Sequence, residues 1–209
     1  MGVKQTGNLN IKEEIQSIFS QYVKIPSYTN SANEKRVEPF LETWFEDQDY
    51  FKTNPQYWGK HPVLNDVLNR HVLWGIVKGM GNDTIVLIHH YDVVEIEEYE
   101  TVRSFAHDVN KINHQVKAML HKFDQQAIDD LNSTAWQFGR GTADMKAGGA
   151  IQLALLKQYA LNPNFHGNVI TTNNSSPSSI IRFFTNRNVF KKICSSENLR
   201  KSTTWNIKW

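Results

Sequence analysis

The sequence of 209 residues has a single cysteine, Cys194, and no apolar run long enough to span a membrane. One cysteine excludes an internal disulfide framework and is typical of a reducing compartment, so we expect a cytoplasmic protein. The short apolar runs predict no transmembrane helix and no membrane partner, and the polar opening, residues 1–10, does not resemble a signal peptide. The 40% hydrophobic and 21% charged residues are ordinary for a globular domain.

Acidic residues are scarce near the end of the sequence. Over residues 169–209, Glu197 is the only acid against seven Lys or Arg, and Ser, Thr and Asn fill many of the other positions. A basic segment of this kind could bind nucleic acid. However, its charges are scattered and its few aromatic residues make no stacking platform, so nucleic-acid binding is the least favoured function.

The rest of the sequence is organised around residues 84–92, Thr-Ile-Val-Leu-Ile-His-His-Tyr-Asp. The apolar run 85–88 predicts a strand buried on both faces, in a sheet covered by helices. Side chains two apart on a strand point the same way, so His90 and Asp92 should project together beyond its carboxyl end, where open α/β sheets bind ligands. A carboxylate beside a histidine can fix the ring for metal binding. Alone, such a triplet is more often an ordinary surface feature.

A second stretch, residues 138–149, reads Phe-Gly-Arg-Gly-Thr-Ala-Asp-Met-Lys-Ala-Gly-Gly. Gly139 and Gly141 predict a tight loop. Asp144 then lies at the start of a helical pattern whose shared face comprises Ala147, Ile151, Ala154 and Leu155. An aspartate presented in this way could bridge two metal ions. Taken alone, the stretch favours the alternative of a helix-capping aspartate, which is the commoner use of Asp at such a place.

Together, residues 90–94 (His-Tyr-Asp-Val-Val) and residues 139–146 (Gly-Arg-Gly-Thr-Ala-Asp-Met-Lys) resemble the motifs of the co-catalytic zinc exopeptidase family. That family includes aminoacylase, acetylornithine deacetylase, succinyl-diaminopimelate desuccinylase and the glutamate carboxypeptidases. The long insert between the motifs is similar to that of the arginine-utilisation protein branch. The resemblance covers about residues 10–168, and the pair of motifs is specific.

The resemblance implies a metal-dependent hydrolase of amide or peptide bonds, acting on a small peptide or an N-acyl amino acid. It implies that His90 ligates one zinc ion, that Asp92 orients His90 as a catalytic residue, and that Asp144 bridges two zinc ions. Cobalt and manganese are alternatives to zinc. It also implies a three-layer α/β/α catalytic domain with a mixed, mostly parallel sheet.

Several elements are predicted from local patterns. Asn10 and Glu13 form an N-cap pair that opens a helix ending at Pro26. A second helix is expected over residues 34–45, and an irregular connection follows near Asn54-Pro55 and His61-Pro62. Residues 71–78 predict a strand that pairs antiparallel with the strand at 84–90. The helix after Asp144 should run to about residue 159.

The insert, about residues 95–137, is predicted to be helical because apolar residues recur every three or four positions from Val109 to Phe123. His107, His114 and His121 recur every seven residues. That spacing places them in a line but too far apart to share one ion, so a solvated helix edge is the better interpretation. His89 faces opposite to His90 and is interpreted as a packed or hydrogen-bonded histidine.

Residues 167–170 begin like another core strand, but the polar sequence after them predicts that the strand does not continue. We therefore divide the chain into a truncated catalytic domain, 1–168, and an irregular segment, 169–209, that is foreign to the family and disordered or frameshifted. In the family, a Glu-Glu pair follows this strand and supplies the general base, yet Glu197 is the only acid after Asp144. Reading the other two frames for such a pair would test the frameshift.

Three classes of function follow. The first is a metal-dependent amide hydrolase that is impaired in this chain, because His90 and Asp144 are only two ligands and a zinc site needs at least three. Weak or single-site metal binding is then expected. The second is a non-catalytic remnant that binds a metal or a protein partner, and the third is a nucleic-acid binder. The truncation would also leave an open sheet edge prone to association. The oligomeric state is left open.

Overall fold

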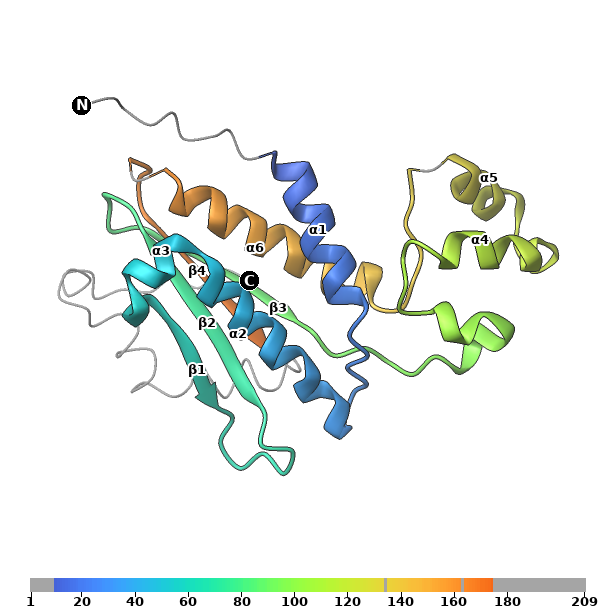
Figure 1. Cartoon of the computed structure of the whole chain (residues 1–209), viewed down its shortest axis with the longest axis horizontal. Helices are drawn as coiled ribbons and strands as arrows, with labels where there is room; N and C mark the ends of the chain where they lie inside the picture. The colour runs from blue at the N-terminus through green and yellow to red at the C-terminus, as the bar shows by residue number, and fades with distance from the viewer. Residues whose placement is uncertain (1–9, 134, 163, 175–209) are drawn as a thin grey trace.

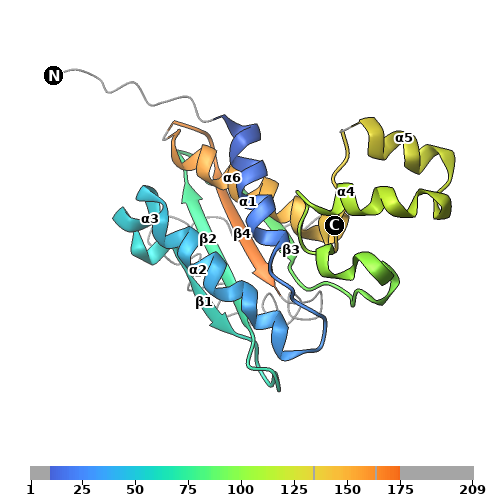
Figure 2. The ribbon, with the colours of Figure 1, turned by 45° about the vertical axis from the view of Figure 1, so that its right-hand side comes forward.

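The computed structural model describes residues 10–133, 135–162 and 164–174. They form a mixed sheet of four strands in the order β1-β2-β4-β3, with helices packed on one face (Figures 1 and 2). The predicted α/β class with a mixed sheet is confirmed. Among the described helices, none is long and apolar enough to cross a membrane.

The central pairings of the sheet differ from the prediction. Strand β4 (Asn168–Asn174) lies between β2 (His71–Lys78) and β3 (Thr84–His90), antiparallel to β2 and parallel to β3. The predicted β2–β3 hairpin is therefore wrong, because β4 occupies the place between the two strands. Two of the three described pairings are antiparallel, so "mostly parallel" is also wrong for this part of the sheet.

The start of β4 explains how the strand reaches the middle of the sheet. The turn between β2 and β3 wraps around it, with the Gly79 amide donating to the Gly167 carbonyl at 2.9 Å and the Asn168 amide donating to the Asp83 carbonyl at 2.7 Å. A Cβ on Gly79 would lie 2.5 Å from that Gly167 carbonyl oxygen, so the close approach requires glycine.

Strand β4 also continues further than the sequence predicted. It runs to Asn174, and all seven of its residues are buried. The predicted boundary after residue 168 therefore cuts through a central strand. The strand could not be recognised from the polar sequence Thr171, Thr172, Asn173 and Asn174, because Asn has a low β propensity. The strand is instead fixed by pairing with a neighbour on each side. Residues 175–209, the remainder of the predicted irregular segment, lie outside the described residues.

Strand β1 (Trp58–Pro62) lies where the sequence predicted an irregular connection, so that prediction is wrong. It pairs antiparallel with β2 at one edge of the described sheet. Proline is tolerated at the end of an edge strand because the missing N–H removes no central ladder bond. The strand is short and its sequence does not alternate, so it gave no period-two signal.

The helices follow the predictions more closely. Helix α1 (Ile11–Val23) begins at the predicted cap, where the Glu13 amide lies 3.4 Å from Asn10 Oδ1. The predicted helix over 34–45 is divided into a 3₁₀ turn and helix α2 (Val37–Asp47). A short helix, α3 (Asp49–Thr53), follows, and helix α6 (Ala147–Ala160) ends one residue beyond the prediction.

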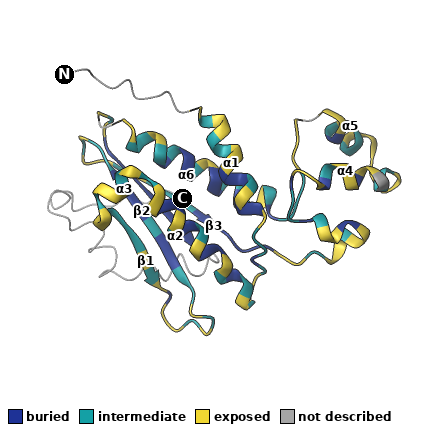
Figure 3. Ribbon diagram, viewed as in Figure 1, coloured by how far each residue is buried: buried dark blue, intermediate teal, exposed yellow. Residues whose placement is uncertain are grey.

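The core lies between the sheet and helices α1, α2 and α6, where Figure 3 shows the buried residues. Leu73 and Val77 of β2 face these helices, and a Cβ on Gly75 would lie 2.4 Å from Phe45 Cε1, so Gly75 lets α2 approach the sheet. Val72 and Ile76 belong to a second buried cluster on the opposite face. The described residues thus supply two layers of the predicted three, the sheet and one layer of helices.

The predicted burial of strand β3 and the predicted buried face of helix α6 are both wrong. In the described part of the sheet β3 is an edge strand, and of its seven residues only His89 is buried, so it is not buried on both faces. In α6 the buried residues are Gly149, Ala150, Leu153, Ala154 and Leu156, whereas Ile151 is exposed. The predicted helix face was therefore rotated from the true one.

The described residues of the insert form several short helical segments instead of a single long helix. It comprises 3₁₀ segments at Glu97–Phe105 and Lys117–Lys122 and helices α4 (Ile112–Val116) and α5 (Gln125–Ser133). Its own small core comprises Val102, Ile112, Val116 and Leu131. His114 and His121 are exposed, as predicted. His107 is not, since its ring lies 3.1 Å from both the Tyr28 hydroxyl and the Val23 carbonyl.

Candidate metal centre

His90 and Asp92 project together from the carboxyl end of β3, as the strand alternation predicted. His90 Nδ1 lies 3.1 Å from Asp92 Oδ1. The other carboxylate oxygen, Asp92 Oδ2, accepts a hydrogen bond of 2.9 Å from the Thr29 hydroxyl. The Asp92 carboxylate is therefore fixed on one side by Thr29 and holds the His90 ring on the other.

Asp144 comes to the same place from a distant part of the sequence. Asp144 Oδ1 lies 2.9 Å from His90 Nε2. The Asp144 side chain is 85% exposed, so its second oxygen is open to solvent or a ligand. The three site residues predicted from the sequence are thus brought together at one rim of the sheet.

The helix-cap alternative for Asp144 is wrong. Helix α6 begins at Ala147, its N-cap residue is Lys146, and that cap makes no side-chain hydrogen bond. Asp144 has extended backbone angles, with φ −121° and ψ 96°, inside an irregular turn at Thr142–Lys146. Its carboxylate is turned toward His90 instead of toward the helix amides.

The glycine loop before Asp144 is as tight as predicted. Gly139 and Gly141 have φ values of 145° and 77°, which favour glycine. A Cβ on Gly141 would lie 2.4 Å from Val93 Cγ1, so the loop packs directly against the segment that follows Asp92. This packing fixes the position of the Asp144 loop relative to β3.

The electrostatics of His90 fit a position between two carboxylates. The pKa of His90 is raised, chiefly by Asp92 through hydrogen bonding, while partial burial opposes the shift and Asp144 adds to it. One ring nitrogen faces Asp92 and the other faces Asp144. Loss of the proton on Nε2 would leave a nitrogen lone pair directed at the Asp144 carboxylate.

These donors fit a divalent metal ion. An imidazole nitrogen and a carboxylate oxygen are the donors that zinc takes in catalytic sites, and a carboxylate on the second nitrogen is the usual partner of a ligating histidine. A cavity of about 240 Å³, lined among others by His90, Asp92 and Asp144, leaves room at these atoms. Among the described residues, no group of three His, Cys, Asp or Glu side chains is placed to hold one ion.

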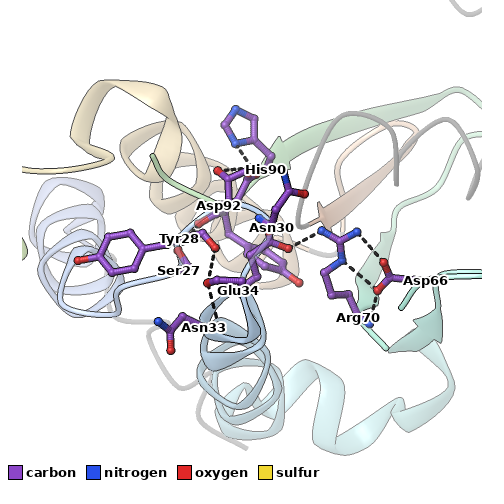
Figure 4. Close-up of polar contacts among 12 residues, drawn as sticks. Ser27, Tyr28, Asn30, Asn33, Glu34, Asp66, Arg70, His90 and Asp92 are labelled. Atoms are coloured by element: carbon purple, nitrogen blue, oxygen red, sulfur yellow. Dashed lines mark hydrogen bonds and ion pairs between the residues drawn. The ribbon is translucent and has the colours of Figure 1, made fainter. Parts of the chain in front are cut away.

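The residues that support Asp92 were not predicted from the sequence. The segment between α1 and α2 pairs with the end of β3 through a Tyr28–Val93 bridge, and the Thr29 amide donates to the Val93 carbonyl at 2.9 Å. The Asn30 amide donates to Glu34 Oε1 at 2.6 Å. This pairing places the Thr29 hydroxyl against Asp92. Figure 4 shows Asp92 beside His90.

A buried ion network anchors that segment. Arg70 Nη1 donates to Glu34 Oε2 at 2.5 Å, and Arg70 also pairs with Asp66 at 2.6 Å. Burial raises the pKa of Glu34 while Arg70 opposes this shift, and hydrogen bonding from Arg70 lowers the pKa of Asp66. Nothing in the local sequence pattern pointed to this network, because its members are separated by up to 36 residues.

Two further ionisable groups lie beneath the site. His89 is buried, with its Nε2 3.1 Å from the Tyr22 hydroxyl and its Nδ1 2.8 Å from Gln152 Oε1, which confirms its predicted packed and hydrogen-bonded role. Lys146 is fully buried, and its ammonium donates to the Ile25 carbonyl at 2.5 Å. Burial lowers the pKa of Lys146 to about 7, against the opposing influence of Asp92.

Comparison with known proteins gives two curated relatives, both from Bacillus subtilis (strain 168). The chain is 34% identical to Uncharacterized protein YqjN over 167 residues, which are 78% of this chain and 29% of that protein. It is 27% identical to Protein RocB over 199 residues, which are 92% of this chain and 35% of that protein. The chain thus spans about a third of the length of these relatives. No family model matches the sequence.

Among solved structures, human carnosine dipeptidase 1 has a similar fold. The TM-score is 0.52 at 11% sequence identity, and the match covers 81% of this chain and 33% of that one. At this identity the likeness concerns the fold alone. The predicted resemblance to the metallo-exopeptidases is confirmed at the level of the fold, and the similarity to Protein RocB covers most of this chain.

Proposed function

We propose that this chain carries part of the active site of a metal-dependent hydrolase of amide or peptide bonds. In this proposal, His90 and Asp144 are metal ligands and Asp92 is the carboxylate that orients His90. The observation that carries it is the convergence of His90 Nε2 and Asp144 Oδ1 at 2.9 Å from positions 54 residues apart. The fold shared with human carnosine dipeptidase 1 supports the assignment.

The residues of the chain would act on the metal and on one another in defined ways. Asp92 Oδ1 lies 3.1 Å from His90 Nδ1 and would favour the proton on that nitrogen, which leaves Nε2 to bind an ion, and Thr29 keeps Asp92 in that orientation. A bound zinc ion would supply Lewis acidity and lower the pKa of a bound water. The Asp144 side chain is 85% exposed, so its second carboxylate oxygen would be available to a second ion.

Efficient hydrolysis needs a general base that the described residues beyond Asp144 do not supply, since none of them is Asp or Glu. A base is needed to take the proton from the attacking water and pass it to the leaving amine. We therefore expect weak or single-site binding of zinc, cobalt or manganese, and slow turnover at most.

We also propose a finer assignment. The chain would be of the exopeptidase or N-acyl-amino-acid deacylase type, act on a small peptide or an N-acyl amino acid, and work in the cytoplasm. Human carnosine dipeptidase 1 is by its name a dipeptidase, which supports a small peptide substrate. The similarity to Protein RocB over 92% of this chain supports placement in the arginine-utilisation branch and a link to arginine catabolism.

Metal titration tests the proposal. Co²⁺ binding is followed by visible absorption and Zn²⁺ binding by calorimetry, for the full chain and for His90→Ala and Asp144→Asn. We expect each variant to weaken binding at least about tenfold, because each loses a direct ligand of a two-ligand site. His114→Ala, which removes an exposed imidazole in the insert, is the control and should bind as the parent does. Unchanged affinity in both site variants would refute the site.

A second candidate is a non-catalytic metal-binding remnant. It is favoured by the absence, within the described residues, of a third side chain placed to complete the ion's coordination. An assay with N-acetyl amino acids and dipeptides separates the two candidates. Turnover that needs added metal and is abolished by a chelator supports the hydrolase. Metal binding at His90 and Asp144 without turnover supports the remnant.

A further inference from the structure

The insert contains a second cavity, of about 420 Å³, that the metal site does not use. Its volume lies in the range of small-molecule pockets, roughly 300–1,000 Å³. The walls are mainly apolar and comprise, among others, Tyr99, Val102, Val116, Met119, Trp136 and Phe138. An apolar cavity of this size has the chemistry to bind an apolar group, and its polar lining residues are few.

Two large aromatic side chains at this cavity are exposed. Trp136 is 57% exposed and Phe123 is 39% exposed, although both line the cavity. Exposed aromatic surface is costly in water, and when it is gathered around a hollow it marks a binding site more often than chance placement does. A ligand lying in the cavity would cover these two rings.

The apolar cavity adjoins the candidate metal centre. Gly139 and Thr142 line both cavities, so one short loop forms a wall of each. At this wall the Arg140 guanidinium pairs with Glu98 and lies 5.1 Å from the centre of the Tyr99 ring. Because Glu98 pairs with Arg140, this guanidinium does not present an unpaired charge beside the wall that the two cavities share.

We propose that the insert cavity binds an aromatic or branched aliphatic group of a substrate whose scissile amide lies at His90 and Asp144. The inference rests on the proposed function and deepens it by naming the substrate class, an amide that bears a bulky apolar group. The insert is then a specificity element, because it supplies most of the cavity wall while β3 and the Asp144 loop supply the metal ligands.

The first experiment measures the apolar site alone. The full chain, stripped of metal with a chelator, is titrated with indole and followed by saturation-transfer NMR and calorimetry. We expect indole to bind, and Trp136→Ser and Val116→Trp each to weaken binding at least about tenfold, the first by removing apolar wall and the second by filling the cavity. Ile151→Ser, which changes an exposed apolar residue outside the cavity lining, is the control and should not alter binding.

The second experiment tests whether one ligand can reach both the metal centre and the apolar cavity. Zinc-loaded chain is titrated with acetohydroxamate and with hydroxamates that carry a phenyl group on one to four methylene groups. We expect at least one phenyl compound to bind about tenfold or more tightly than acetohydroxamate. Trp136→Ser should abolish that gain while leaving acetohydroxamate affinity unchanged.

The two experiments separate failure of this inference from failure of the proposed function. Absence of indole binding, or binding that neither cavity variant changes, would overturn the apolar site. If no phenyl hydroxamate binds more tightly than acetohydroxamate, the link between the apolar site and the metal centre is overturned. If no hydroxamate binds while indole binding responds to Trp136→Ser, the proposed metal site fails and the apolar cavity stands.

Discussion

His89 and His90 are adjacent in the sequence but have opposite environments. Strand alternation turns His89 into the core, where burial lowers its pKa to about 4, and turns His90 to the rim, where carboxylates raise its pKa. Gln152 donates from Nε2 to the Ile88 carbonyl, so its Oε1 accepts from His89 Nδ1–H, and His89 Nε2 accepts from the Tyr22 hydroxyl. His89 is therefore a neutral structural group.

The buried state of His89 predicts a pH dependence of stability. Its pKa is about 4 when folded, against an ordinary value of 6.5. The contribution of neutral His89 to the free energy of unfolding is therefore complete above pH 6.5. It falls by roughly 3 kcal/mol as the pH drops from 6.5 to 4. When the free energy of unfolding is measured with urea at several pH values, it should fall less steeply across this window for His89→Gln than for the parent. An equal slope in the parent and the variant would contradict the prediction.

Gly149 in α6 allows the helix to lie against His89. A Cβ there would lie 2.6 Å from His89 Nε2 and 2.9 Å from Tyr22 Cε1, whereas at Gly148 it would meet only Met145 Cε, at 3.3 Å. We expect Gly149→Ala to lower the free energy of unfolding by roughly 1–3 kcal/mol. Gly148→Ala is the matched control and should be neutral or stabilising by up to about 1 kcal/mol. Identical urea midpoints for the two variants would refute this account.

At the scale of elements, the segment between α1 and α2 positions the metal site through Asp92. Its pairing with Val93 brings the Thr29 hydroxyl to Asp92, and Asp92 in turn faces His90. Thr29 is thus a positioning residue. The Glu34–Arg70 pair anchors the same segment from the other side.

This arrangement predicts a selective effect of Thr29→Val. The substitution keeps the shape of the side chain and removes the hydroxyl that donates to Asp92. We expect zinc affinity to fall roughly tenfold, the lower end of the usual effect of outer-shell changes. The readout is zinc calorimetry beside urea unfolding, with Thr53→Val, an exposed helix residue, as control. A loss of stability with no change in zinc affinity would show a merely structural role.

The sequence predicted the elements whose signals are local. Helix α1 was predicted with its cap, as were strands β2 and β3 and the end of α6, since each shows a clear period or a terminating residue. The convergence of His90, Asp92 and Asp144 was predicted from paired motifs. The place of β4 between β2 and β3 could not be predicted, because a pairing between distant segments leaves no periodic signal.

At the scale of the whole molecule, the described sheet has β3 at its edge, with Ile85 60% exposed. Exposed apolar edge strands favour pairing between chains, and natural proteins block it with charged side chains such as lysine. We expect Ile85→Lys to reduce self-association at micromolar concentration, measured by light scattering coupled to size exclusion. Val67→Lys is the control, because Val67 is 92% exposed in the connection between β1 and β2. Equal self-association of both variants and the parent would contradict the prediction that chains associate through the edge strand β3.

The central claim is that His90 and Asp144 hold a divalent metal ion at one rim of the sheet. The most direct measurement is a crystal structure of the full chain grown with zinc, with anomalous scattering to locate the ion. The account predicts zinc within about 2.0–2.2 Å of His90 Nε2 and of an Asp144 carboxylate oxygen, with Asp92 still beside His90 Nδ1. Zinc bound elsewhere, with neither residue as a ligand, would contradict it.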